Sequence, residues 1–186
     1  MAVDTEQVRE LLRQLGAETV PHPGGSLFAH LDRVRGRLAG WGARPALQLA
    51  GLCHAFYGTD GFPGALLPLD RRAELRAVIG PEAEAIVHLY ASCDRKATYP
   101  VLADRGHDAF RARFHDRFTG TGSVPAPGPC ADFAELTAAN ELDLAEGNMA
   151  FRAAWGPALL ALFTGWRPLL SEPAWNDCRA VLPDIP

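Results

Sequence analysis

Two histidines, His30 and His54, are the first candidates for acid–base or metal chemistry, because each falls on the apolar face of a predicted helix. His30 falls beside Leu31 and Val34 at helical spacing, and His54 continues an apolar row that begins at Leu47. Both side chains are therefore expected to point into a packed interior. Imidazole titrates near neutral pH and also binds divalent metals, so a buried pair could carry acid–base chemistry or hold a metal ion.

The connection between the two predicted helices brings these histidines together. The segment Gly40–Arg44 is short, which predicts that the helices before and after it are antiparallel neighbours. His30 and His54 are about equally far from this turn, so they are expected at the same level of the helix pair. The alternative is two separate core histidines, each satisfied by a neighbouring polar group.

Helices are predicted along most of the chain, and no segment alternates like a strand that ends in a hairpin turn. Apolar spacing, capping residues and flanking Gly or Pro predict them at 4–15, 26–40, 45–57, 70–79, 81–93, 104–118, 131–146 and 151–170, with a last short helix around Trp175. The expected fold class is all-α. The chain is predicted to form a single domain, 1–186, with an N-terminal helix and loop (1–25), a core (26–146) and C-terminal helices (150–182).

Composition excludes several classes of protein. The 186 residues are 48% hydrophobic and 22% charged, which is typical of a globular chain with a core. A net charge of −4 without a basic run argues against a nucleic-acid partner or an anionic membrane surface. No apolar run reaches about 18 residues, and no signal sequence is visible, so a cytoplasmic protein without a membrane partner is expected. The four cysteines form no Cys-x-x-Cys motif, which predicts free thiols in a reducing compartment.

The order of motifs resembles the HD-domain superfamily of metal-dependent phosphohydrolases, most closely the hydrolase domain of bacterial (p)ppGpp synthetase/hydrolases. The residues that carry this resemblance are His30-Leu31-Asp32-Arg33-Val34, the segment from Leu49 to Asp60 with His54, residues 73–87, and the segment from Leu136 to Leu142 with Asn140. The likeness covers about residues 26–144. It implies an HD-like helical bundle with a C-terminal helical extension. The stretch around His54 is also similar to an uncharacterised bacterial HD-like family.

The chain departs from the superfamily at the positions that supply negative charge to the metal. Ala55 stands where the superfamily has Asp after its second His, and Asn140 stands where it has its final Asp. A ligand set of His30, His54 and Asn140 has no anionic member, and hard cations prefer carboxylate oxygen. The acidic pair associated with pyrophosphate hydrolysis is also absent, since Gly58 and Thr59 occupy those positions. A (p)ppGpp hydrolase is therefore not expected.

The favoured hypothesis is an enzyme that acts on a small metabolite by histidine acid–base catalysis, with a degraded metal site. It would be a lyase, isomerase, cyclase or hydrolase. The predicted catalytic residues are His30, His54, Tyr57 and Asp143, and the predicted substrate-binding residues are Asp60, Arg95, Lys96 and Asn140. One alternative keeps a single divalent ion, held by His30, His54 and Asn140, for phosphoester hydrolysis or iron-dependent oxygenation. Another is a non-catalytic ligand-binding or scaffold protein. A homodimer is left open.

Of three further histidines, His107 and His115 are rivals for the His-Asp element. His22, between Pro21 and Pro23, is expected on a surface loop, with a lid over the pocket as the alternative. His107 and His115, each followed by Asp, are rival positions for a His-Asp element, but their apolar context is poor and a surface location is expected.

Overall fold

Helices make up most of the chain in the computed structural model, which describes residues 4–102, 114–123 and 129–182. The predicted all-α class is confirmed. The chain divides into two units, Met1–Ala91 and Ser92–Pro186. The predicted core, 26–146, therefore includes residues of both units.

The first unit contains five helices and one small hairpin among its described residues. The elements are α1 (Thr5–Gln14), β1 (Pro21–His22), β2 (Gly25–Ser26), α2 (Leu27–Gly40), α3 (Pro45–Cys53), the 3₁₀ turn η1 (Leu69–Arg71), α4 (Arg72–Ile79) and α5 (Pro81–Ser92). The side chains of Asp4 and Ser26 cap α1 and α2, as their positions in the sequence predict. Pro45 and Pro81 open α3 and α5, where a missing N–H costs nothing.

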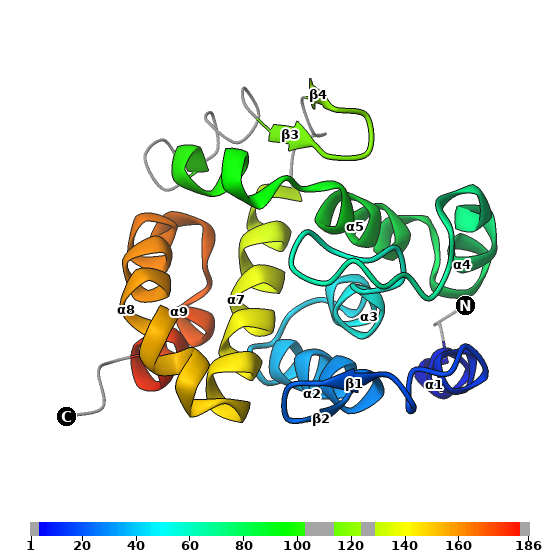
Figure 1. Cartoon of the computed structure of the whole chain (residues 1–186), viewed down its shortest axis with the longest axis horizontal. Helices are drawn as coiled ribbons and strands as arrows, with labels where there is room; N and C mark the ends of the chain where they lie inside the picture. Colours follow the sequence, from blue (N-terminus) through cyan, green and yellow to red (C-terminus); the bar gives the residue numbers. More distant parts are fainter. Residues whose placement is uncertain (1–3, 103–113, 124–128, 183–186) are drawn as a thin grey trace. The chain divides into compact units, whose positions relative to one another are not determined.

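Helices α2 and α3 lie side by side as the short turn between them predicts (Figure 1). Gly51 allows this close approach, because a Cβ atom at that position would lie 2.5 Å from Cδ1 of Leu38 and 3.5 Å from Cα of Arg35. Leu31, Val34 and Leu38 on α2 are fully buried. The pair is therefore held by a tight apolar seam, and this seam carries both histidines.

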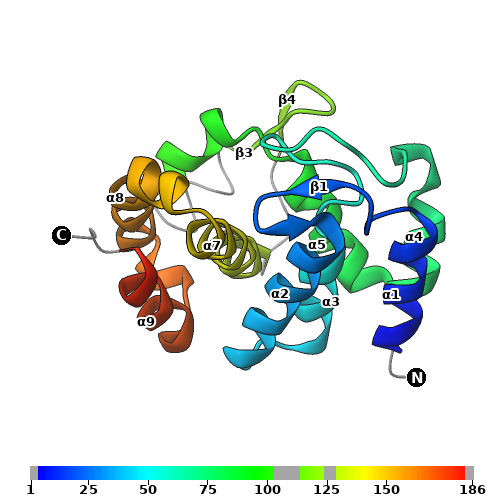
Figure 2. The same ribbon diagram turned by 60° about the horizontal axis from the view of Figure 1, so that its bottom comes forward.

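The hairpin β1–β2 packs at the N-terminal end of α2 (Figure 2). Its two strands pair Pro21 with Ser26 and His22 with Gly25. Backbone bonds from Leu27 N–H to the Val20 carbonyl (2.9 Å) and from Phe28 N–H to the Ala17 carbonyl (3.0 Å) attach the first turn of α2 to the chain before the hairpin. The hairpin is thus fixed to the helix that carries His30.

The second unit is built around the helix α7 (Pro129–Gly147), which packs against α8 and α9 (Figure 1). The other described elements are a helical segment at 95–102, β3 (Phe114–Asp116), β4 (Thr121–Ser123), α8 (Met149–Gly165), η2 (Arg167–Leu169) and α9 (Glu172–Val181). Phe114, Phe133, Phe163 and Trp166 form its buried aromatic core. Within the described ranges, no helix is both long enough and apolar enough to cross a bilayer.

Three local predictions are wrong. Two short antiparallel hairpins exist where no strand was expected. Residues 114–116, at the end of the predicted helix 104–118, form a strand; the remainder, 104–113, lies outside the described residues. Here Asp116 Oδ1 accepts the N–H groups of Phe118 and Thr119, so a local turn replaces the helix that the phenylalanine spacing suggested.

The predicted helix 45–57 ends early, at Cys53. The next residues form turns, with Phe56 N–H bonded to the Cys53 carbonyl and Gly58 N–H bonded to the Ala55 carbonyl. Gly58 has a φ of +68°, a conformation that favours glycine. As a result His54 occupies the C-cap of α3 rather than a position within the helix.

We predict that the Gly51→Val variant loses about 1–3 kcal/mol of unfolding free energy, because the added methyl groups overpack the α2–α3 seam. The matched control is Gly36→Val on α2, where a Cβ atom meets nothing within 4 Å. The control should stay within about 0.5 kcal/mol of the wild type. Urea unfolding measures both. Equal stability of the two variants would contradict the tight seam.

Candidate functional site

The two predicted histidines meet in the interior of the first unit. His30 Nε2 and His54 Nε2 are 3.3 Å apart, and the side-chain exposure of these residues is 1% and 2%. His30 comes from α2 and His54 from the C-cap of α3. The prediction that these two side chains lie at the same level of the helix pair is confirmed.

A backbone carbonyl fixes the protonation state of one ring nitrogen. His54 Nδ1 lies 2.8 Å from the carbonyl oxygen of Gly51, at the end of α3. Because a carbonyl oxygen only accepts, Nδ1 carries the proton. In a neutral pair, Nε2 of His54 is then the acceptor, and His30 Nε2–H donates to it. The two Nε2 atoms therefore share one proton between them.

A third histidine stacks on His30. The ring of His22 stacks on the ring of His30, with centroids 4.0 Å apart and planes 24° from parallel. Phe62 meets His22 edge-on at 5.6 Å. The sequence-based expectation placed His22 on a surface loop and kept a lid as the alternative; the structure places its half-buried ring against the predicted site.

Tyr90 of α5 borders the pair on another side. Its ring meets the ring of His54 edge-on, with centroids 5.5 Å apart. Tyr90 is buried, as are Leu31 and Ala50 near the two histidines in sequence. Tyr90 therefore gives His54 an aromatic neighbour from α5.

Tyr57, a predicted catalytic residue, has its hydroxyl bound elsewhere. It donates to Glu84 Oε1 at 3.0 Å, while Arg72 binds both oxygens of Glu84, at 2.7 and 3.0 Å. Glu84 is buried, so this bidentate ion pair satisfies its charge. Burial and the nearby Glu84 carboxylate raise the pKa of Tyr57 well above its usual range. The cluster gives Tyr57 a structural role, and a catalytic role stays a prediction.

Two predicted site residues of the second unit, Arg95 of the segment 95–102 and Asn140 of α7, share a polar cluster with Glu141. Asn140 donates to Glu141 Oε1 at 3.1 Å, and Arg95 binds the same oxygen at 2.9 Å. Glu141 is buried, so Arg95 has a clear structural function as its counterion. Asp143 is also buried on α7. The assignment of Asn140, Arg95 and Asp143 to the histidine site stays a prediction.

The remaining candidates lie at the surface. Asp60 is exposed in the loop after α3, Lys96 is exposed in the helical segment 95–102, and His115 is exposed on β3. His107 lies outside the described residues. Substrate binding by Asp60 and Lys96 is untested.

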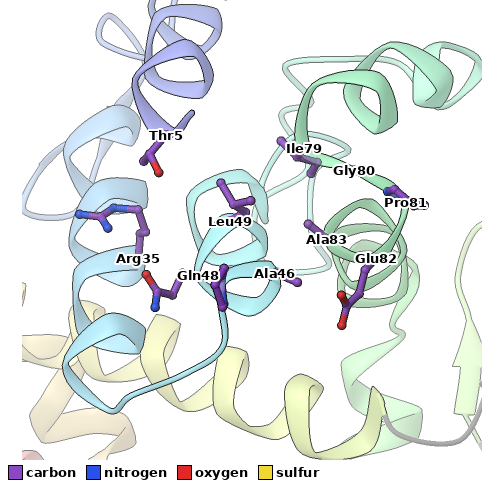
Figure 3. Close-up of a pocket in the computed structure, with 11 residues that line it drawn as sticks. Thr5, Arg35, Ala46, Gln48, Leu49, Ile79, Gly80, Pro81, Glu82 and Ala83 are labelled. Carbon is purple, nitrogen blue, oxygen red and sulfur yellow. The ribbon is translucent and has the colours of Figure 1, made fainter. Parts of the chain in front are cut away.

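A pocket of about 450 Å³ opens around the N-terminal turns of α3 (Figure 3). Its two charged side chains are engaged in ion pairs, Arg35 with Asp32 and Glu82 with Arg44. Neither His30 nor His54 lines this pocket. Its lining residues are Thr5, Arg35, Pro45, Ala46, Gln48, Leu49, Ile79, Gly80, Pro81, Glu82 and Ala83.

The histidine pair fits a metal only in part. Two imidazole nitrogens bound at about 2.1 Å to one tetrahedral ion would lie about 3.4 Å apart, close to the observed 3.3 Å. The bond from His54 Nδ1–H to a carbonyl is also the usual support of a ligating imidazole. However, no group of three His, Cys, Asp or Glu side chains that could hold a metal occurs in the described part of the chain.

The comparisons with known proteins give one match. The model of a family described as "Domain of unknown function (DUF6817)" matches residues 11–95. This segment is just under half of the chain, and it contains the three histidines and the Tyr57–Glu84–Arg72 cluster. No curated protein and no solved structure matches the chain.

Sequence reasoning missed the partners of the predicted residues. Glu84 and Arg72 carry no motif, and their pairing with Tyr57 depends on how α4 and α5 fold back toward the end of α3. His22 did carry a signal. It lies between two prolines in a turn directly before an N-capped helix, and such a turn holds the His22 side chain close to that helix.

We predict that the Tyr57→Phe variant loses about 1 kcal/mol of unfolding free energy at neutral pH, the typical contribution of one hydrogen bond. The raised pKa of Tyr57 means that the folded protein keeps a proton which the unfolded chain releases above about pH 10. The stabilisation is therefore complete below about pH 10 and is lost as the pH rises further. Urea unfolding from neutral pH to about pH 11 should show the difference between wild type and variant shrinking; a constant difference would contradict this.

Proposed function

We propose that this chain is an enzyme that acts on a small metabolite by acid–base catalysis at the pair His30–His54. The observation that carries the proposal is the 3.3 Å separation of two buried Nε2 atoms, one of which has its tautomer fixed by the Gly51 carbonyl. Proton transfer by such a positioned imidazole typically contributes a factor of about 10²–10⁴ to a rate.

The pair offers one donor and one acceptor side by side. A substrate that separates the two rings would meet His30 Nε2–H as a proton donor and His54 Nε2 as a proton acceptor. Adjacent addition and removal of protons is what eliminations, isomerisations, cyclisations and hydrolyses require. We therefore retain lyase, isomerase, cyclase and hydrolase as the reaction classes. The bond to Gly51 keeps the proton on Nδ1 and leaves Nε2 of His54 as the base.

We also propose that the chain is a divergent HD-like protein. The supporting features are the all-α class, one histidine on α2, the second at the end of α3, and the meeting of the two across an antiparallel helix pair. Ala55 and Asn140 replace the superfamily's carboxylates, so (p)ppGpp hydrolysis is not part of the proposal.

The proposed partner is a small organic substrate, and the proposed compartment is the cytoplasm. All four cysteines are buried free thiols, which suits a reducing environment. The net charge of −4 speaks against a nucleic-acid partner.

We predict that His30→Gln and His54→Gln each lower the turnover rate by about 10²–10⁴-fold. The purified protein is incubated with a small-molecule cell extract, and consumed metabolites are followed by mass spectrometry. The matched control is His115→Gln, which changes an exposed histidine of β3 and should behave like the wild type. Folded variants that consume the same metabolite at the wild-type rate would refute catalysis at this pair and leave a ligand-binding or scaffold role.

The second candidate is a mononuclear metal enzyme, favoured by the fit of the two Nε2 atoms to one ion. His30 and His54 would supply two ligands, and the ion would supply Lewis-acid activation of water or substrate.

Metal analysis separates the two candidates. We expect protein purified without added metal to contain no stoichiometric Fe, Mn or Zn, and His54→Ala to leave its metal content unchanged. A stoichiometric metal that disappears in His54→Ala but persists in His115→Ala would overturn the metal-free mechanism in favour of the second candidate.

A further inference from the structure

We propose that His22 is a positioning residue of the histidine site, which orients the ring of His30 and controls reagent access to it. The inference deepens the proposed function, on which its catalytic meaning rests. The contacts of His22 involve only residues of the first unit, so they can be tested without a substrate.

The first observation is the geometry of the contact. The rings of His22 and His30 are nearly parallel at 4.0 Å, so His22 covers one face of the His30 ring. His30 itself is buried, whereas His22 is partly exposed. His22 therefore forms an outer layer over an inner imidazole.

The second observation is that two separate loops hold His22 in place. The hairpin pairs His22 with Gly25, next to Ser26, which caps α2. On the other side Phe62 contacts the His22 ring edge-on. Phe62 in turn is held by reciprocal backbone bonds with Thr59, of 2.7 and 3.1 Å.

Both loops are continuous with the helices that carry the pair. The hairpin leads directly into α2 and His30, and the turn at Thr59–Phe62 follows α3 and His54. His22 thus bridges the two chain segments on which the 3.3 Å contact depends. Stacking restricts rotation of the His30 ring and keeps its Nε2 directed at His54.

The orientation of His30 should therefore require a planar ring at position 22. A ring that stacks without titrating should preserve the arrangement of His30, and a small side chain should not. A purely structural residue of the hairpin would alter stability without a selective effect on His30.

The test is carbethoxylation of histidines by diethyl pyrocarbonate near neutral pH, read per residue by peptide mass spectrometry. In His22→Ala we expect the rate at His30 to rise about tenfold, the factor that corresponds to an aromatic pair of about 1.4 kcal/mol. In His22→Phe the rate at His30 should stay near the wild-type value. The control, His115→Ala, should leave His30 unchanged.

Nitrogen-15 NMR of the imidazoles gives the second readout. His22→Ala should remove the fixed Nε2–H signature of His30, and His22→Phe should retain it. Folded His22→Ala protein with wild-type reactivity at His30 would overturn the proposal, and so would a His22→Phe variant that behaves like His22→Ala.

Phe62→Ala covers the case in which His22→Ala fails to fold. It removes only the edge contact, and it should raise the reactivity of His22 and, to a smaller extent, of His30; no change at either would overturn the proposal. Failure of the proposed catalysis is recognised separately, by wild-type turnover in His30→Gln and His54→Gln while the reactivity pattern stands.

Discussion

The hydrogen bond from His54 Nδ1–H to the Gly51 carbonyl is the interaction on which the site depends. It uses one of the carbonyls that the end of α3 leaves without a helical partner, so the bond stabilises the helix end and orients the ring at once. It also leaves Nε2 of His54 as an acceptor, which makes the contact with His30 favourable. Without it, either nitrogen of His54 could face His30, and the pair would have no defined donor and acceptor.

In each unit one buried glutamate is satisfied by partners from the same unit. Arg72 and Tyr57 neutralise and solvate Glu84, and Arg95 and Asn140 do the same for Glu141. A buried carboxylate needs such partners, because leaving it unpaired costs several kcal/mol, on the order of 3–5. The histidine pair differs in kind, because its two rings contact each other and His54 bonds to a backbone carbonyl.

Helical periodicity was sufficient to predict the central contact. Apolar spacing placed His30 and His54 inward, and the short turn at Gly40–Arg44 set them at one level, as the structure confirms. The cap at Ser26 and the prolines at positions 45 and 81 gave the starts of α2, α3 and α5 correctly. Periodicity failed where short-range hydrogen bonding overrides it, at the turn after Cys53 and at Asp116. It also could not reveal His22 over His30, because a two-residue hairpin has no repeating pattern to read.

Gly51 affects both the packing of α2 against α3 and the orientation of His54. Its missing side chain permits the close approach of α2 and α3, and its carbonyl sets the tautomer of His54. A larger side chain at this position must displace Leu38, and any shift of the α3 backbone that accompanies it also moves the Gly51 carbonyl. A substitution at position 51 therefore acts on the packing of the helix pair and on the geometry of His54 through the same residue.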